Sequence, residues 1–153
     1  RSPSRGLGDV YKRQEYIIPL GVAEIKREGT DVTIVSFGKI IKEAYAAAEE
    51  LAKENISVEI IDLRTIRPMD HKTILESVKK TNRLVILEEA WPFGSIASEI
   101  TYIVQERAFD YLDAPIQRIT TADTPAPYSP VLLKEWLPNA GDVVKAVKKV
   151  MYK

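Results

Sequence analysis

The feature that most constrains the fold of this chain is a regular alternation of two hydrophobic patterns from residue 31 onward. Short runs rich in β-branched residues predict buried strands, and longer stretches with apolar residues three or four apart predict amphipathic helices. The predicted strands are 32–37, 58–62, 83–88 and 115–119. The predicted helices are 39–54, 70–80, 95–109 and a last one capped by Asn139. Strands separated by such helices predict a mainly parallel sheet covered on both faces, a three-layer α/β/α fold.

Two further stretches do not follow this alternation. Residues 120–138 contain four prolines, and we predict an extended loop there, because proline disfavours helix interiors and central strands. Loops of this length inside compact domains are often functional. Residues 15–30 form a predicted linker in which an edge-strand pattern covers Val22–Lys26. The main domain is therefore predicted to span residues 31–153.

The composition excludes several kinds of protein. The 22 Lys and Arg residues balance 22 Asp and Glu residues, so the chain lacks the basic excess typical of nucleic-acid binders. It has no cysteine, which excludes disulfides, thiolate nucleophiles and cysteine-ligated zinc. A single histidine excludes two-histidine metal motifs. The longest aliphatic run, Leu84–Leu87, is too short to cross a bilayer. We therefore expect neither nucleic acid nor a membrane as a partner.

Residues 1–14 are predicted to be a non-native, disordered tail. Ser4–Gln14 resembles the in-frame translation of an adapter and transposon end used in tagmentation sequencing libraries. Two alternatives are a basic N-terminal arm and, through Gly6 and Gly8, part of a phosphate-binding loop, although no strand precedes these glycines. The tail holds four basic residues and one acidic residue, so the other 139 residues carry 18 basic and 21 acidic ones. The authentic sequence is expected to begin near Glu15.

Acidic residues follow two of the predicted strands, at the edge where parallel sheets bind ligands. Asp62, Glu88 and Glu89 could together hold Mg²⁺ for phosphoryl transfer, since hard cations prefer carboxylate oxygens. The favoured interpretation is that these carboxylates cap helix N-termini or pair with Arg64 and Arg67. Beyond the tail there is no GxxxxGK[ST] or GxGxxG loop, so phosphate chemistry lacks its usual cradle.

Nucleophilic and general-base chemistry has little support in the sequence. His71 follows a predicted helix cap and is expected in a solvated first turn; as a base it would need a positioned carboxylate and a cleft. Ser95 and Ser98 have no other histidine to activate them, so hydrolase chemistry is not supported. We predict no catalytic, cofactor-binding or metal-ligating residue in this chain.

Four aromatic residues stand in predicted loops. Trp91 and Phe93 flank a proline before the helix that Ser95 opens, and Tyr128 and Trp136 lie in the proline-rich stretch. They either pack locally under these loops or anchor a subunit interface, where tryptophan is enriched. We predict Trp91, Phe93, Tyr128 and Trp136 as subunit-interface residues.

Several stretches then identify a family. They are Ile18–Gly21 with Ala23–Gly29, Asp31–Gly38, Glu59–Asp70, Glu88–Pro92, Glu106–Pro115 and Ala122–Tyr128. Together they resemble the C-terminal domain of transketolase-type thiamine enzymes, above all the beta subunit of the decarboxylating component of 2-oxo acid dehydrogenase complexes. Trp91-Pro92 and Ala122–Tyr128 resemble the pyruvate enzymes more than the branched-chain ones.

The resemblance implies a five-stranded, mostly parallel sheet with an antiparallel edge strand, which agrees with the pattern over Val22–Lys26. It also implies an α2β2 enzyme of the bacterial cytoplasm that decarboxylates pyruvate on thiamine diphosphate with Mg²⁺ and passes the acetyl group to lipoyl. In this family the cofactor lies between the alpha subunit and the N-terminal domain of beta, which would precede Glu15. This chain would then organise the tetramer and help to dock the subunit-binding domain of the lipoyl acyltransferase, and it would be inactive alone.

Other interpretations remain open at this point. The same domain occurs in branched-chain 2-oxo acid dehydrogenases and in other transketolase-type enzymes. An interpretation of another class is a stand-alone flavodoxin-like domain that binds a metal through its strand-end carboxylates.

Overall fold

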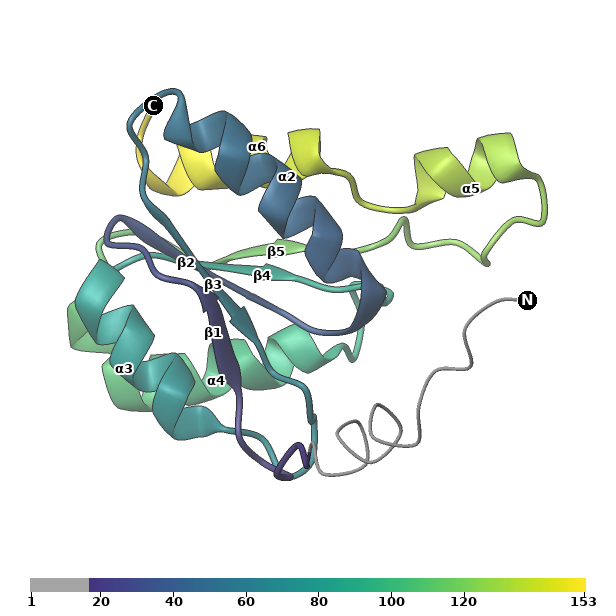
Figure 1. Cartoon of the computed structure of the whole chain (residues 1–153). Helices are drawn as coiled ribbons and strands as arrows, with labels where there is room; N and C mark the ends of the chain where they lie inside the picture. Colours follow the sequence, from purple (N-terminus) through teal and green to yellow (C-terminus); the bar gives the residue numbers. More distant parts are fainter. Residues whose placement is uncertain (1–16) are drawn as a thin grey trace, which may run out of the picture.

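A five-stranded sheet lies between two pairs of helices in this computed structural model, which describes residues 17–153 (Figure 1). The strands are β1 (Glu24–Arg27), β2 (Val32–Ser36), β3 (Val58–Asp62), β4 (Leu84–Leu87) and β5 (Gln117–Ile119). The helices are α2 (Ile41–Ala52), α3 (His71–Thr81), α4 (Ile96–Ala108), α5 (Pro130–Trp136) and α6 (Ala140–Val150), with short 3-10 turns η1 (Gly38–Ile40) and η2 (Phe109–Tyr111). The predicted tail, residues 1–14, lies outside the described residues.

The strand order is β1-β3-β2-β4-β5. β2 pairs in parallel with both β3 and β4, and β4 pairs in parallel with β5. β1 runs antiparallel to β3 at the edge of the sheet. This arrangement confirms the predicted three-layer fold, the mostly parallel sheet and the antiparallel edge strand.

Each face of the sheet is covered by its own pair of helices. α2 and α6 cover one face and α3 and α4 cover the other (Figure 1). Side chains along a strand alternate between the faces, so Ile34 belongs to the α2/α6 core and its neighbour Val35 to the α3/α4 core. All five residues of β2 are buried, as expected for a central parallel strand.

Two helices begin at the caps that the sequence predicts. The Thr73 backbone N–H donates to Asp70 Oδ1 at 3.0 Å at the start of α3. At the start of α6, the Asn139 side chain accepts from the Asp142 N–H while the Asp142 carboxylate accepts from the Asn139 N–H. These bonds satisfy N–H groups that have no partner within the helix.

The proline-rich stretch differs from the prediction of an extended loop without helix. Pro130–Trp136 forms α5, so the prediction for residues 120–138 is wrong over these residues. Pro130 occupies the first helical turn, where its missing N–H costs no hydrogen bond. The other prolines flank the helix on either side, and a proline breaks a helix only when it lies inside one.

A buried carboxylate connects the sheet with α3. Glu59 on β3 is fully buried, and the Lys80 ammonium donates to it and, at 2.9 Å, to Glu28. Gly29 allows the chain to pass close to the backbone of β3, because a Cβ at this position would lie 2.2 Å from the Glu59 nitrogen. Burial lowers the pKa of Lys80, but its hydrogen bonds to the two carboxylates outweigh this and raise that pKa above its ordinary value.

Replacing Lys80 with methionine is expected to lower the free energy of unfolding by about 2 kcal/mol, because Glu59 keeps a buried charge without its partner. The cost is limited by solvent at the partly exposed ammonium. Since the pKa of Lys80 is raised on folding, charged Lys80 stabilises the folded state fully below about pH 10 and progressively less at higher pH. This is the contribution that the variant loses. Urea unfolding at pH 7 and pH 11 measures it.

Lys72→Met on the same helix is the control for this change. Its ammonium is exposed and its ion pair with Glu76 is long, at 3.9 Å. The expected loss in the free energy of unfolding is therefore below about 0.5 kcal/mol. Equal losses for the two variants would contradict the role given to Glu59.

Candidate functional site

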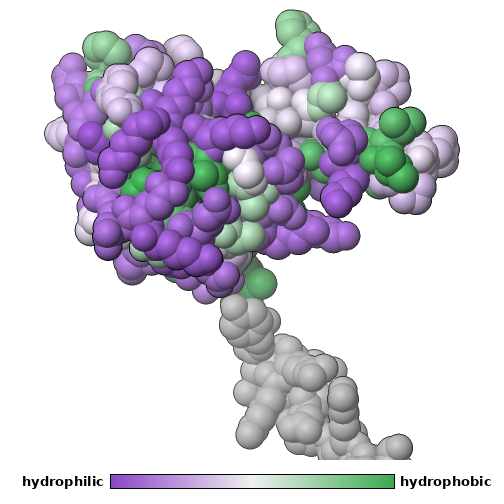
Figure 2. Space-filling view, turned by 90° about the horizontal axis from the view of Figure 1, so that it is seen from above, coloured by the Kyte–Doolittle hydropathy of each residue, from purple (hydrophilic) through white to green (hydrophobic). Residues whose placement is uncertain are grey.

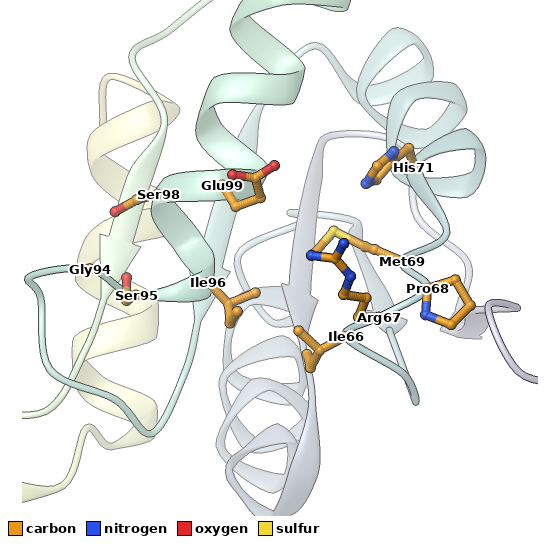
Figure 3. Close-up of a pocket in the computed structure, with 10 residues that line it drawn as sticks. All are labelled: Ile66, Arg67, Pro68, Met69, His71, Gly94, Ser95, Ile96, Ser98 and Glu99. Carbon is orange, nitrogen blue, oxygen red and sulfur yellow. The ribbon is translucent and has the colours of Figure 1, made fainter.

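A cleft opens beyond the carboxyl end of β2. It has a volume of about 830 Å³ and is lined by Ile66–Met69 and His71 on one side and by Gly94–Ile96, Ser98 and Glu99 on the other. The first group lies between β3 and the start of α3, and the second lies between β4 and the first turn of α4 (Figure 3). We call this cleft the crevice.

The strand-end carboxylates do not line the crevice as a metal site. Glu88 is fully buried, and its Oε2 accepts the Ala97 N–H at 3.2 Å. Asp62 Oδ1 accepts the Arg64 N–H at 3.0 Å, and Glu89 is exposed. Within residues 17–153, no group of three or more acidic or histidine side chains could hold a metal ion. The interpretation of Glu88 as a helix cap is therefore confirmed.

Ion pairing at this edge only partly follows the sequence. The sequence predicted that Arg64 pairs with a carboxylate at a strand end. It forms an ion pair instead with Glu24 on β1. Arg67 points into the crevice (Figure 3), and in the described part of the chain it has no ion pair. Its placement could not be read from the sequence, because it depends on how the loops after β3 and β4 meet.

Ser95 precedes α4 but does not cap it. Its hydroxyl makes no capping bond, because Glu88 already accepts the Ala97 N–H. Ser95 is 9% exposed, and its Oγ has no hydrogen-bond partner among the described residues. Two neighbouring strand ends carry similar buried atoms without partners, Ser36 Oγ and Glu88 Oε1.

The histidine and serines considered for nucleophilic chemistry all line the crevice but are not hydrogen-bonded to one another. Ser98 Oγ accepts from Arg118 Nη1 at 2.7 Å. Within residues 17–153, His71 has no side-chain hydrogen bond. A nucleophile and base must share a hydrogen bond to act together, so this edge does not support hydrolase chemistry.

Residues 121–137 form an arm that projects from the carboxyl edge of the sheet and carries α5 (Figure 1). At its base, the Thr121 N–H and hydroxyl both donate to the Ala90 carbonyl at 3.0 Å. Trp91 Nε1 and Trp136 Nε1 both donate to the Thr124 carbonyl, at 3.0 and 2.9 Å. The two indoles thus hold the arm against the loop after β4.

The arm and the neighbouring loop expose large side chains to solvent. Phe93 is 93% exposed and Tyr128 fully exposed, while Val131 and Leu132 on α5 are also exposed. Figure 2 shows hydrophobic residues on the surface of the lobe that the arm forms. Single exposed apolar residues are normal, but a group of them indicates an interaction surface. The subunit-interface role of the four aromatic residues stays a prediction.

The segment before β1 lies at the same edge. The Gly21 N–H donates to Thr65 Oγ1 at 2.9 Å, and the Ala23 N–H donates to Asp70 Oδ2 at 3.0 Å. Burial raises the pKa of the Asp70 carboxyl, but hydrogen bonds from Thr73 and Ala23 outweigh this and hold that pKa below its ordinary value. Asp70 therefore joins this segment to the start of α3.

Residues 21–143 match the family model described as the C-terminal domain of transketolase. The chain belongs to the transketolase C-terminal domain family. The match covers the sheet from β1 to the start of α6 and therefore includes both the crevice and the arm.

Curated relatives of this transketolase C-terminal domain are beta subunits of the E1 component of pyruvate dehydrogenase. The mitochondrial subunit of Dictyostelium discoideum is 50% identical over 144 residues, covering 94% of this chain and 40% of that protein. The subunit of Rhizobium meliloti is 53% identical over 145 residues, covering 95% of this chain and 32% of that protein. This chain thus spans about a third to two fifths of these relatives.

Solved structures give the same fold. A split-gene transketolase, described as an inactive beta4 tetramer, superposes with a TM-score of 0.78 at 28% identity, over 90% of this chain and 44% of that one. A 2-oxoglutarate:ferredoxin oxidoreductase from Magnetococcus marinus superposes with a TM-score of 0.59 at 14% identity, over 93% and 21%. Over residues 17–153 we find no helix with the length and apolar character to cross a membrane.

Replacing Asp70 with asparagine is expected to cost about 1–2 kcal/mol at pH 7, because an amide cannot accept all three hydrogen bonds. Since the pKa of Asp70 is lowered on folding, its contribution is present above about pH 4 and is lost as the pH falls through the folded value. The difference between variant and parent in urea unfolding should therefore shrink below pH 4. Asp110→Asn, at an exposed carboxylate, should change stability little at any pH.

Substitutions at Glu88 and Ser95 test which of these side chains caps α4. Glu88→Ala is expected to lower the free energy of unfolding by about 2 kcal/mol, because it removes the Ala97 partner and leaves a cavity. Ser95→Ala should change it by less than about 0.5 kcal/mol, below the usual cost of losing a cap. Urea unfolding measures both. A cost near 1 kcal/mol for Ser95→Ala would show that its hydroxyl caps α4 after all.

Proposed function

We propose that this chain is the assembly domain of the beta subunit of a pyruvate dehydrogenase decarboxylating component. The observation that carries the proposal is the 50–53% identity to such subunits over nearly the whole chain. The exposed arm supports it, because a projecting lobe with apolar side chains suits a subunit interface. The division into a linker and edge strand over residues 15–30 and a main domain over residues 31–153 is part of the same proposal.

The whole enzyme would decarboxylate pyruvate on thiamine diphosphate and pass the acetyl group to lipoyl. We propose that the cofactor and its Mg²⁺ are bound by other parts of the assembly. Two observations support this proposal: the described residues contain no group of three or more His, Cys, Asp or Glu side chains that could hold a metal ion, and Glu88 already caps α4. No step of the reaction is assigned to residues of this chain.

The proposed partners are an alpha subunit and a second beta subunit in an α2β2 assembly, and the subunit-binding domain of the lipoyl acyltransferase. The split-gene transketolase whose structure is similar is named as an inactive beta4 tetramer. That name suits a chain that associates with copies of itself but needs another subunit for activity. We propose the bacterial cytoplasm as its location.

A second candidate is the same domain of a branched-chain 2-oxo acid dehydrogenase. It is less favoured, because the curated relatives described above are pyruvate dehydrogenase subunits. The reconstituted enzyme would distinguish the two by its turnover of pyruvate against a branched-chain 2-oxo acid.

Co-expression tests the assembly role. The chain is produced with an alpha subunit and with the amino-terminal part of the Rhizobium meliloti beta subunit, and the assembly is weighed by native mass spectrometry. We expect an α2β2 complex that decarboxylates pyruvate, whereas the chain alone with pyruvate and thiamine diphosphate should show no turnover. Turnover by the chain alone would contradict the proposal.

A variant that changes both the arm and the loop after β4 tests where the interface lies. Phe93→Ser combined with Tyr128→Ser is expected to weaken assembly at least about tenfold, because buried aromatic anchors dominate interface energies. Tyr102→Ser, at an exposed aromatic residue of α4, is the control and should assemble normally. Normal assembly of the double variant would place the interface elsewhere.

A further inference from the structure

We propose that Arg118 is the positioning residue of the assembly surface: it holds the loop after β4 so that Phe93 stands in a fixed place before any partner binds. The inference rests on the proposed function, in which Phe93 belongs to a subunit interface. Arg118 itself lies on β5, outside the arm. The assembly surface therefore depends on a side chain of the sheet as well as on the arm.

Phe93 protrudes from the loop between β4 and α4, and its side chain is 93% exposed. The next residue, Gly94, has a φ of +68°, a conformation that glycine adopts without strain. A Cβ added to Gly94 would have no neighbouring heavy atom within 4 Å, so this part of the loop stands free in solvent. Packing does not hold the aromatic ring, and its position depends on the backbone that carries it.

That backbone is held at the residues just before Phe93. The Ala90 carbonyl and the Trp91 indole are hydrogen-bonded to the arm. The Pro92 carbonyl, directly before Phe93, accepts from Arg118 Nη1 at 3.2 Å. The contact from Arg118 is thus the one that lies next to the exposed ring.

Arg118 also connects this loop to α4. The same nitrogen, Nη1, donates to Ser98 Oγ at 2.7 Å, and a guanidinium nitrogen of this kind carries two N–H groups, one for each acceptor. Among residues 17–153, Arg118 forms no ion pair, and both acceptors are neutral oxygens. Hydrogen bonds from a charged donor are stronger than those between neutral groups. The guanidinium therefore fixes the loop against β5 and α4 instead of neutralising a carboxylate.

A fixed loop favours assembly because ordering a mobile segment on binding costs conformational entropy. On a held backbone, Phe93 loses only the freedom of its own side chain when a partner covers it. A protruding aromatic anchor fits a pocket with apolar walls, and this is the kind of surface we expect on the partner. Without Arg118 the ring is still present but its place is not defined, so assembly should weaken.

A spin label can measure the mobility of this loop. The chain has no cysteine, so one introduced cysteine carries a nitroxide label, with Phe93→Cys for the loop and Tyr102→Cys for the exposed face of α4. Adding Arg118→Met is expected to shorten the rotational correlation time at residue 93 at least about twofold and to leave that at residue 102 unchanged. Unchanged mobility at residue 93, or an equal change at both residues, would contradict the proposal.

Assembly tests the consequence for the interface. The chain is combined with an alpha subunit and the amino-terminal part of the Rhizobium meliloti beta subunit, and complexes are quantified by native mass spectrometry. Arg118→Met should weaken assembly at least about tenfold in the parent chain. In the Phe93→Ser chain it should have almost no effect, because no anchor is left to position. An equal loss in both chains would show that Arg118 contacts the partner directly and would overturn the proposal.

Arg107→Met is the matched control. Arg107 is an exposed arginine in the last turn of α4 that forms an ion pair with its neighbour Glu106, so its replacement should change neither the mobility at residue 93 nor assembly. A loss as large as that of Arg118→Met would overturn the proposal. Failure of the parent chain to assemble counts against the proposed function, whereas normal assembly of both the parent and Arg118→Met counts only against the positioning role.

Discussion

The structure depends on β2, which is buried along its whole length and pairs in parallel with a neighbour on each side. Parallel neighbours require crossover helices, and right-handed crossovers on the two sides place α2 on one face of the sheet and α3 and α4 on the other. The loops after β3 and β4 must therefore leave the sheet on either side of the β2 terminus. The crevice lies between these diverging loops, and the base of the arm, which follows β5, is hydrogen-bonded to the loop after β4.

Carboxylates at this edge mainly solve a structural problem. A helix that starts beside a buried strand end has N–H groups that water cannot reach, and a nearby carboxylate satisfies them. Glu88 accepts the Ala97 N–H at the start of α4. Asp70 accepts the Thr73 N–H at the start of α3 and also the Ala23 N–H in the segment before β1. Because Glu88 takes this task, the Ser95 hydroxyl makes no capping bond although Ser95 directly precedes α4.

The sequence predicts most of the fold because the patterns are local and strong. The β-branched run of β2, the apolar stripe of α6 and the caps Asp70 and Asn139 all act within a few residues, so they could be read directly. α5 was missed because prolines dominate its surroundings, and only Pro130 at the first turn is compatible with a helix. The aromatic residues of the loops were found as candidates, but their exposure could not be, since it depends on where the arm projects.

The sequence by itself therefore determined the α/β class, the helix starts and the membership of the transketolase C-terminal domain family. Only the tertiary structure decided which side chains meet at the carboxyl edge. Arg67 lies in the loop after β3, His71 begins α3 and Glu99 lies in the first turn of α4, and all three line the crevice because β3 and β4 flank β2. Periodic patterns in the sequence predict individual helices and strands. A site between two loops depends on the order of the strands, and that order is established by contacts between distant parts of the chain.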